Sequence, residues 1–271
     1  MEKIVLSEFT PLDSAGHSSK GNQLKWNYGD CWYKADHMGY EGLAEVVIAR
    51  LLEYSDVADY VYYAPVQIEY KGKAYMGCKS DNFLQPDEEL ITIEHLFRQY
   101  TGKSLSGEMG RITEVSDRII YMVENVMDFT GLADFGSYIS TLLAIDAFFL
   151  NEDRHTNNIA VIYRPEEQRY RLSPIFDNGL SLFADVATDF AFDKSPDECR
   201  KRIEAKPFSR DFDEQLDAAE EMYGSHVHFT FGKKEIDRIL EKCADGYPKE
   251  AVERIRETLY QQVRKYKYMF A

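Results

Sequence analysis

Several features that define common protein classes are missing from this chain of 271 residues. No stretch approaches the ~20 consecutive apolar residues that a membrane helix needs. The opening MEKIVLSEFT lacks the basic and then apolar run of a secretory signal. The four cysteines lie far apart, which argues against a zinc knuckle or a disulfide framework. We therefore expect a cytoplasmic protein that makes no contact with a membrane.

Positive charge is also scarce. The chain has 32 lysines and arginines against 47 acidic residues, so its formal net charge is -15. A broad basic face for a nucleic-acid backbone is not expected from this balance, and we predict no direct contact with nucleic acid. Hydrophobic residues make up 44% of the chain, which is enough to build a core.

Alternating segments at the start of the chain predict a small α+β lobe over residues 1–86. Aromatic, strand-like sequence around residues 24–36 is followed by helical periodicity over 40–55, and β-type composition then returns. Lys71-Gly72-Lys73 reads as a hairpin turn, because glycine tolerates the positive φ that such turns require.

A larger, mainly helical lobe is predicted over residues 87–271. Pro86 and the acidic residues after it predict a helix that begins near Asp87. One β-like interruption divides the helical runs: two short strands, the second ending at Asp177. The fold class is therefore expected to be α+β, with two lobes.

A polar loop, NEDRHTNN, follows an apolar helix and leads into the first of these strands. Asp153 and Asn158 lie on this loop, and the hairpin would return Asp177 to the same cleft. Phosphoryl transfer from ATP needs hard oxygen ligands for Mg²⁺ and a carboxylate that orients the attacking hydroxyl. Asp153 suits the carboxylate role, while Asn158 and Asp177 suit the metal. The whole set predicts a kinase better than a solvated loop.

The same spacing occurs a second time in the chain, so spacing alone does not identify the loop. Asp146 and Asn151 are also five residues apart, but they lie in or at the end of an apolar helix. We interpret Asp146 as a packing or supporting residue. His155 is kept as a candidate cofactor contact, although a histidine in such a loop more often hydrogen-bonds the loop backbone.

ATP binding also needs a cation for the phosphates and an acidic residue that holds this cation. Lys34, late in an aromatic strand, suits the first role. Glu41 and Glu45 lie one turn apart on one face of the next helix. Glu45 is favoured because it lies further inside the helix, and Glu41 remains open.

Two further segments are candidates for nucleotide contacts. The first is a Gly- and Ser-containing stretch whose backbone amides could wrap phosphates. The second is a strand that could meet adenine through its backbone. The candidate residues are Ser18, Ser19, Gly21 and Gln23 for the phosphates, and Gly77 and Cys78 for adenine.

Taken together, SSKGNQLK, WYKAD, the D-R-H-x-x-N of the polar loop and IFDNG resemble the HipA-like serine/threonine kinases. The resemblance implies a two-lobed protein-kinase-like fold, ATP with Mg²⁺, and phosphorylation of a protein substrate. It gives Asp153, Asn158, Asp177 and Lys34 the roles assigned above. Because about 17 residues precede the Ser/Gly stretch, it implies a short form without an extra N-terminal subdomain. An antitoxin-like protein partner and autophosphorylation of Ser18 or Ser19 stay open.

Three other functions remain as alternatives. A small-molecule phosphotransferase would use a similar Asp and Asn pair. A catalytically silent nucleotide-binding module would bind Mg-ATP without transfer. A zinc hydrolase built on His155, His226 and His228 is the weakest, because no local ligand motif accompanies these histidines.

Overall fold

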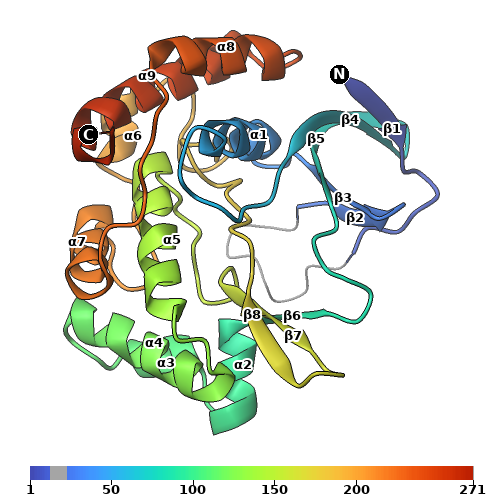
Figure 1. The fold of residues 1–271 in the computed structure, drawn as a ribbon. Coiled ribbons are helices and arrows are strands. Elements are labelled where there is room, and N and C mark those ends of the chain that lie inside the picture. The colour runs from blue at the N-terminus through green and yellow to red at the C-terminus, as the bar shows by residue number, and fades with distance from the viewer. Residues whose placement is uncertain (13–22, 271) are drawn as a thin grey trace. The chain divides into compact units, whose positions relative to one another are not determined.

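A computed structural model describes residues 1–12 and 23–270 of the chain (Figure 1). The contacts divide the chain into two compact units. The first unit comprises Met1–Asn82, Asp177–Ile203 and His228–Ala271, and the second comprises Phe83–Phe176 and Glu204–Val227. The first boundary lies close to the predicted division at residue 86, but two later segments pack with the N-terminal one. The assignment of a nucleotide-binding lobe to residues 1–86 stays a prediction.

The first unit contains a five-stranded mixed sheet in the order β1-β4-β5-β3-β2. Its strands are β1 (Glu2–Val5), β2 (Lys25–Tyr28), β3 (Cys31–Ala35), β4 (Ala64–Tyr70) and β5 (Lys73–Asp81). β1 runs parallel to β4, and the other pairs are antiparallel. Trp26, Tyr33 and Ile68 form part of the buried cluster on this sheet.

The turn between β4 and β5 is the predicted hairpin. Tyr70 pairs with Lys73, and the two residues between them, Lys71 and Gly72, have φ angles of 49° and 73°. Two consecutive positive φ angles characterise the turn whose twist matches that of the flanking strands. The hairpin prediction is therefore confirmed.

Helices of the first unit include the predicted helix after β3. They are α1 (Glu41–Leu52), α6 (Pro196–Arg200), α8 (Lys233–Cys243), α9 (Lys249–Lys265) and the short 3₁₀ helix η1 (Lys267–Phe270). α1 packs so closely on β5 that a Cβ atom on Gly42 would lie 2.6 Å from the carbonyl carbon of Gly77. Only glycine leaves room for this approach.

The second unit combines a three-stranded antiparallel sheet with five helices among its described residues. The strands are β6 (Glu89–Thr92), β7 (Ala160–Arg164) and β8 (Arg169–Leu172), in the order β6-β7-β8. The helices are α2 (Ile93–Thr101), α3 (Leu105–Met109), α4 (Val115–Thr130), α5 (Phe135–Phe149) and α7 (Phe212–Tyr223). α5 is buried on nearly every face and packs against α4 and α7, as expected for a helix that is apolar all round.

Two element boundaries differ from prediction. The segment after Pro86 forms β6, which pairs with β7, and α2 begins only after Thr92, whose side chain caps it by accepting from the His95 N–H. β8 ends at Leu172 rather than at Asp177. Pro174, two residues further on, lacks the N–H that a longer ladder would use. The α+β fold class is confirmed.

Among the described residues, no helix has the length and apolar character needed to cross a membrane.

Candidate active site

Lys34 is the centre of a buried polar cluster in the first unit. β3 carries Lys34, and its Nζ atom donates to Glu45 Oε1 at 2.6 Å and to Asp177 Oδ1 at 2.8 Å. The Tyr63 hydroxyl lies 3.4 Å from the same Nζ. Lys34 is 8% exposed and Glu45 is 1% exposed, so this is an ion pair removed from water.

Electrostatics keep this lysine charged. Burial would lower the pKa of Lys34, but the attraction of Asp177 and Glu45 outweighs it and raises the pKa well above the ordinary value. The pKa of the nearby Tyr63 hydroxyl is raised, because burial and the Glu45 carboxylate disfavour its anion. The ammonium group of Lys34 is thus permanently charged and fixed in position by its two carboxylate partners.

The structure distinguishes the two glutamates of α1. Glu41, at the first position of the helix, accepts backbone N–H groups from His37, Met38 and Gly39. Glu45, one turn later, contacts Lys34. Glu45 is therefore the glutamate placed beside the lysine, and Glu41 closes the loop before the helix.

Asp177 is held at an unusual backbone position. Its φ is 61°, in the left-handed region that is uncommon for residues other than glycine, although aspartate and asparagine adopt it more often than most. The next residue, Asn178, donates its backbone N–H to Glu45 Oε2 at 2.9 Å, so one glutamate binds both Lys34 and the segment that carries Asp177. Lys25 Nζ lies 4.0 Å from Asp177 Oδ1. Strained backbone of this kind often occurs at functional sites.

The polar loop after α5 belongs to the second unit. Asp153 is buried, and its Oδ1 accepts from Lys206 Nζ at 3.0 Å. Asn158 donates its side-chain N–H to the Asp153 carbonyl at 2.9 Å. His155 donates its backbone N–H to that carbonyl at 2.8 Å and accepts from the Asn158 N–H through its own carbonyl. The loop is thus closed by its own hydrogen bonds. The Asp153 side chain contacts Lys206 through Oδ1, and its Oδ2 lies 3.8 Å from His155 Nε2.

A fully buried ion pair supports this loop. Arg154 donates to Asp146 in α5 through Nε at 2.9 Å and is 0% exposed, as is Asp146. Its NH1 group also donates to the carbonyls of Asn158 and Phe176. Burial raises the pKa of Asp146, and the Arg154 guanidinium acts in the opposite direction. The predicted supporting role of Asp146 is thus explained by Arg154, which ties α5 to the loop and to the end of the hairpin.

Removing Asp146 should destabilise the protein strongly. Asp146→Ala leaves the Arg154 charge buried without its anion, and breaking such a pair costs about 3–5 kcal/mol in the free energy of unfolding. Asp197→Ala is the matched control: it removes an exposed partner of Arg200 and should cost less than about 1 kcal/mol. Urea denaturation measures both. Equal losses in the two variants would contradict a structural role for the buried pair.

Each unit has one predicted oxygen donor of the kind that magnesium binds. Asp177 in the first unit provides a carboxylate, and Asn158 in the second unit uses its amide nitrogen for the Asp153 carbonyl. Its amide oxygen accepts no hydrogen bond from any described residue, so it remains available to a cation. Carboxylate and amide oxygens are the hard ligands that Mg²⁺ prefers.

The residues predicted to contact the nucleotide lie in three different places relative to the described structure. Ser18, Ser19 and Gly21 lie outside the described residues, and Gln23 is half-buried two residues before β2. Gly77 and Cys78 lie within β5, which pairs with β3 on one edge and β4 on the other. They lie in the middle of the sheet, and the adenine contact stays a prediction. Gly77 instead lies under α1, and a Cβ on it would come 2.1 Å from the Lys34 carbonyl oxygen.

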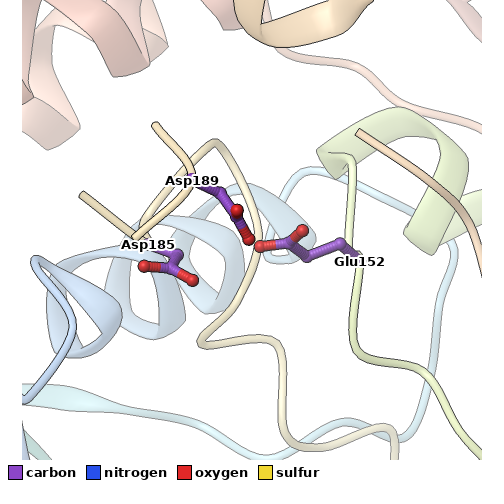
Figure 2. A group of neighbouring side chains, drawn as sticks. All are labelled: Glu152, Asp185 and Asp189. Carbon is purple, nitrogen blue, oxygen red and sulfur yellow. The ribbon is translucent and has the colours of Figure 1, made fainter. Parts of the chain in front are cut away.

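Some polar residues carried no local sequence signal. Lys206 contacts Asp153 from 53 positions away and lies in no recognisable motif. Asp185 in the first unit is fully buried (Figure 2). Its carboxylate accepts from the backbone N–H and the hydroxyl of Thr188, at 3.0 and 2.5 Å. This carboxylate closes the turn that also carries the exposed Asp189.

The overall fold matches solved structures. The proinflammatory kinase CtkA of Helicobacter pylori aligns with a TM-score of 0.61 at 17% identity, over 97% of this chain and 94% of CtkA. A chain in the complex of HipA, HipB and operator DNA from Shewanella oneidensis aligns at 0.49 and 14%, over 96% of this chain and 66% of that one. No family model and no curated protein matches the sequence. The chain therefore has an α+β fold similar to that of the kinase CtkA.

Proposed function

We propose that the protein is an ATP- and Mg²⁺-dependent kinase that phosphorylates a serine or threonine hydroxyl of another protein. The observation that carries this proposal is the buried Lys34, held at 2.6 Å from Glu45 and at 2.8 Å from Asp177. This trio provides the cation, the residue that positions it and a metal-binding carboxylate, which phosphoryl transfer from ATP requires.

Lys34 has the role of binding the nucleotide phosphates. Its contacts to two carboxylates fix the ammonium group before ATP arrives, so less side-chain entropy is lost on binding. Bound Mg²⁺ would neutralise charge on the phosphates and on the transferring group. Asp177 would then share its charge between the metal and Lys34, while Glu45 keeps the lysine in place.

Asp153 has the role of orienting the acceptor hydroxyl and accepting its proton. Lys206, 3.0 Å from Asp153 Oδ1, constrains the carboxylate. Asn158 would provide a second oxygen for the metal. The backbone bonds within the loop and the Arg154 brace hold both residues in a fixed geometry, which is what catalytic positioning requires.

The test is transfer of labelled γ-phosphate to a protein in the presence of Mg²⁺, with Lys34→Ala as the diagnostic variant. We expect kcat/KM to fall on the order of 10² or more, since preorganised charge near the phosphates is lost. Lys79→Ala is the matched control, because this lysine lies on the neighbouring β5 in an exposed pair with Glu2. Its activity should stay within about twofold of the wild type.

Other results would identify the alternatives. Full activity in Lys34→Ala, with the variant folded by circular dichroism, would overturn the assignment. Transfer to amines or sugars but to no protein would indicate a small-molecule phosphotransferase. Thermal stabilisation by Mg-ATP without any transfer would indicate a nucleotide-binding module. The antitoxin-like partner stays a prediction that these assays do not address.

A further inference from the structure

A small hollow lies beside Asp153 in the second unit. Its volume is about 270 Å³, which is below the roughly 300–1,000 Å³ of sites that enclose a whole small molecule. It has room for one side chain of a bound peptide rather than for a nucleotide. Its lining includes Met109, Arg118, His155, Thr156, Lys206 and Pro207.

The charge of this hollow is opposite to that of the protein as a whole. Arg118 and Lys206 are cations in its wall, and none of its lining residues is a carboxylate within the described parts of the chain. The whole chain, by contrast, has a formal charge of -15. A cationic recess on an acidic protein attracts an anion locally, where a general basic surface is lacking.

Both cations are held in place. Arg118 donates through Nε to the Ile112 carbonyl at 2.8 Å and through NH1 to the Phe208 carbonyl at 2.6 Å, so its guanidinium has a fixed orientation. Lys206 is fixed by Asp153. Neutral carbonyls do not cancel the Arg118 charge, which remains available to a ligand.

Two carboxylates that contact lining residues of the hollow, Glu94 and Asp153, already have partners. Glu94 accepts from the Ser106 N–H at 3.0 Å and from the Thr156 hydroxyl at 2.9 Å, and it pairs with Arg98 on its own helix. Asp153 is shared with Lys206. His155 also lines the hollow, and its Nδ1 atom is buried without a hydrogen-bond partner among the described residues.

We propose that the hollow binds the carboxylate of an aspartate or glutamate that neighbours the acceptor hydroxyl in the substrate protein. This inference rests on the proposed kinase function and names the substrate class. Met109 and Pro207 would cover the aliphatic part of the side chain, while Arg118 and Lys206 bind its carboxylate. Because Lys206 contacts both Asp153 and the hollow, the acidic residue lies within about two positions of the acceptor, given ~3.4 Å per extended residue.

The test uses synthetic peptides with one serine and either glutamate, alanine, lysine or phosphoserine at each position from two before to two after it. Wild-type protein should phosphorylate the best glutamate peptide with kcat/KM at least about tenfold above the alanine peptide, equivalent to one charge-assisted contact of about 1.4 kcal/mol. The peptide with lysine at that position should not share the gain in kcat/KM over the alanine peptide. Fluorescence anisotropy of labelled peptides measures binding independently of transfer.

Arg118→Gln should remove the glutamate preference by raising the KM for the glutamate peptide. The kcat/KM for the alanine peptide should stay unchanged, because Arg118 does not contact Asp153. Arg111→Gln is the control: this arginine, seven positions earlier, is exposed and pairs with Glu108. Lys206→Gln tests the second cation if Arg118→Gln does not fold, and it should weaken binding of the glutamate peptide most.

The outcomes separate the two proposals. Transfer without a glutamate preference, or a preference that survives in Arg118→Gln, overturns this inference and leaves the kinase assignment standing. A stronger preference for phosphoserine than for glutamate also overturns it, in favour of a phosphate subsite. If no peptide is phosphorylated but glutamate peptides bind in an Arg118-dependent way, the kinase assignment fails and the binding site stands. The absence of both transfer and binding would overturn the inference.

Discussion

Asp177→Asn should reduce phosphoryl transfer by on the order of 10³, since this carboxylate would provide the main anionic ligand for magnesium. The substituted amide is the same size but neutral. It would weaken both the metal site and the attraction that raises the pKa of Lys34. The measurement is kcat at saturating ATP over a series of Mg²⁺ concentrations. We expect a large loss that higher Mg²⁺ restores only in part.

The control for this variant is Asp193→Asn, which neutralises an exposed aspartate in the same unit and should leave kcat unchanged. Folding should survive in Asp177→Asn, because Glu45 still pairs with Lys34 and still binds the Asn178 N–H. Wild-type kcat in a folded Asp177→Asn protein would remove this aspartate from the metal site.

The local features of the fold were predictable because they depend on neighbours in the sequence. The helical periodicity of residues 40–55 predicted α1, and Gly72 between two β-type runs predicted the hairpin. The start of α2 was misplaced because the acidic residues after Pro86 suggested a helix cap. Pairing with β7, more than 60 residues away, extends the chain there instead.

Parts of the candidate site were predictable for a different reason. The choice of Lys34, Asp153, Asn158 and Asp177 came from residue types and motif order, and the contact between Lys34 and Asp177 joins residues 143 positions apart. The sequence favoured Glu45 over Glu41 only because Glu45 lies further inside the helix, and it left Glu41 open since both lie on one helix face. The separation follows from position: Glu41 at the first turn meets free backbone N–H groups, whereas Glu45 faces β3.

Features that depend on contacts between residues far apart in the sequence could not be predicted. Gly42 and Gly77 bring α1 onto β5, but neither glycine lies in a turn motif that would indicate this role. Arg154 looked like a loop residue, yet it is among the largest fully buried side chains. Its burial depends on Asp146 and on the Phe176 carbonyl, which only the folded chain brings to it. The same holds for Lys206 beside Asp153.

Asp153→Asn is expected to lower kcat by about 10² to 10⁴, the usual contribution of a positioned general base. Asparagine can still accept from Lys206, so the loop should keep its shape, but its neutral amide cannot take the proton of the hydroxyl. The KM for ATP should change little, because the proposed phosphate contacts lie on other residues. Single-turnover transfer with saturating ATP measures the loss in the chemical step directly.

Asp146→Asn is the matched control for this last prediction, since it changes an aspartate of the same loop system by the same atoms. Its main effect should be on the free energy of unfolding, through the buried Arg154. Because Arg154 also braces the loop, some loss of kcat per folded molecule is expected, but a smaller one than in Asp153→Asn. Asp153→Asn should show the reverse: an unfolding curve close to the wild type and a large loss of kcat. Each aspartate lies five residues before an asparagine, so spacing does not distinguish them. The contrast between kcat and stability in the two variants distinguishes the catalytic aspartate from the structural one. If Asp146→Asn lost kcat without losing stability while Asp153→Asn kept it, the catalytic role would belong to the residue in α5.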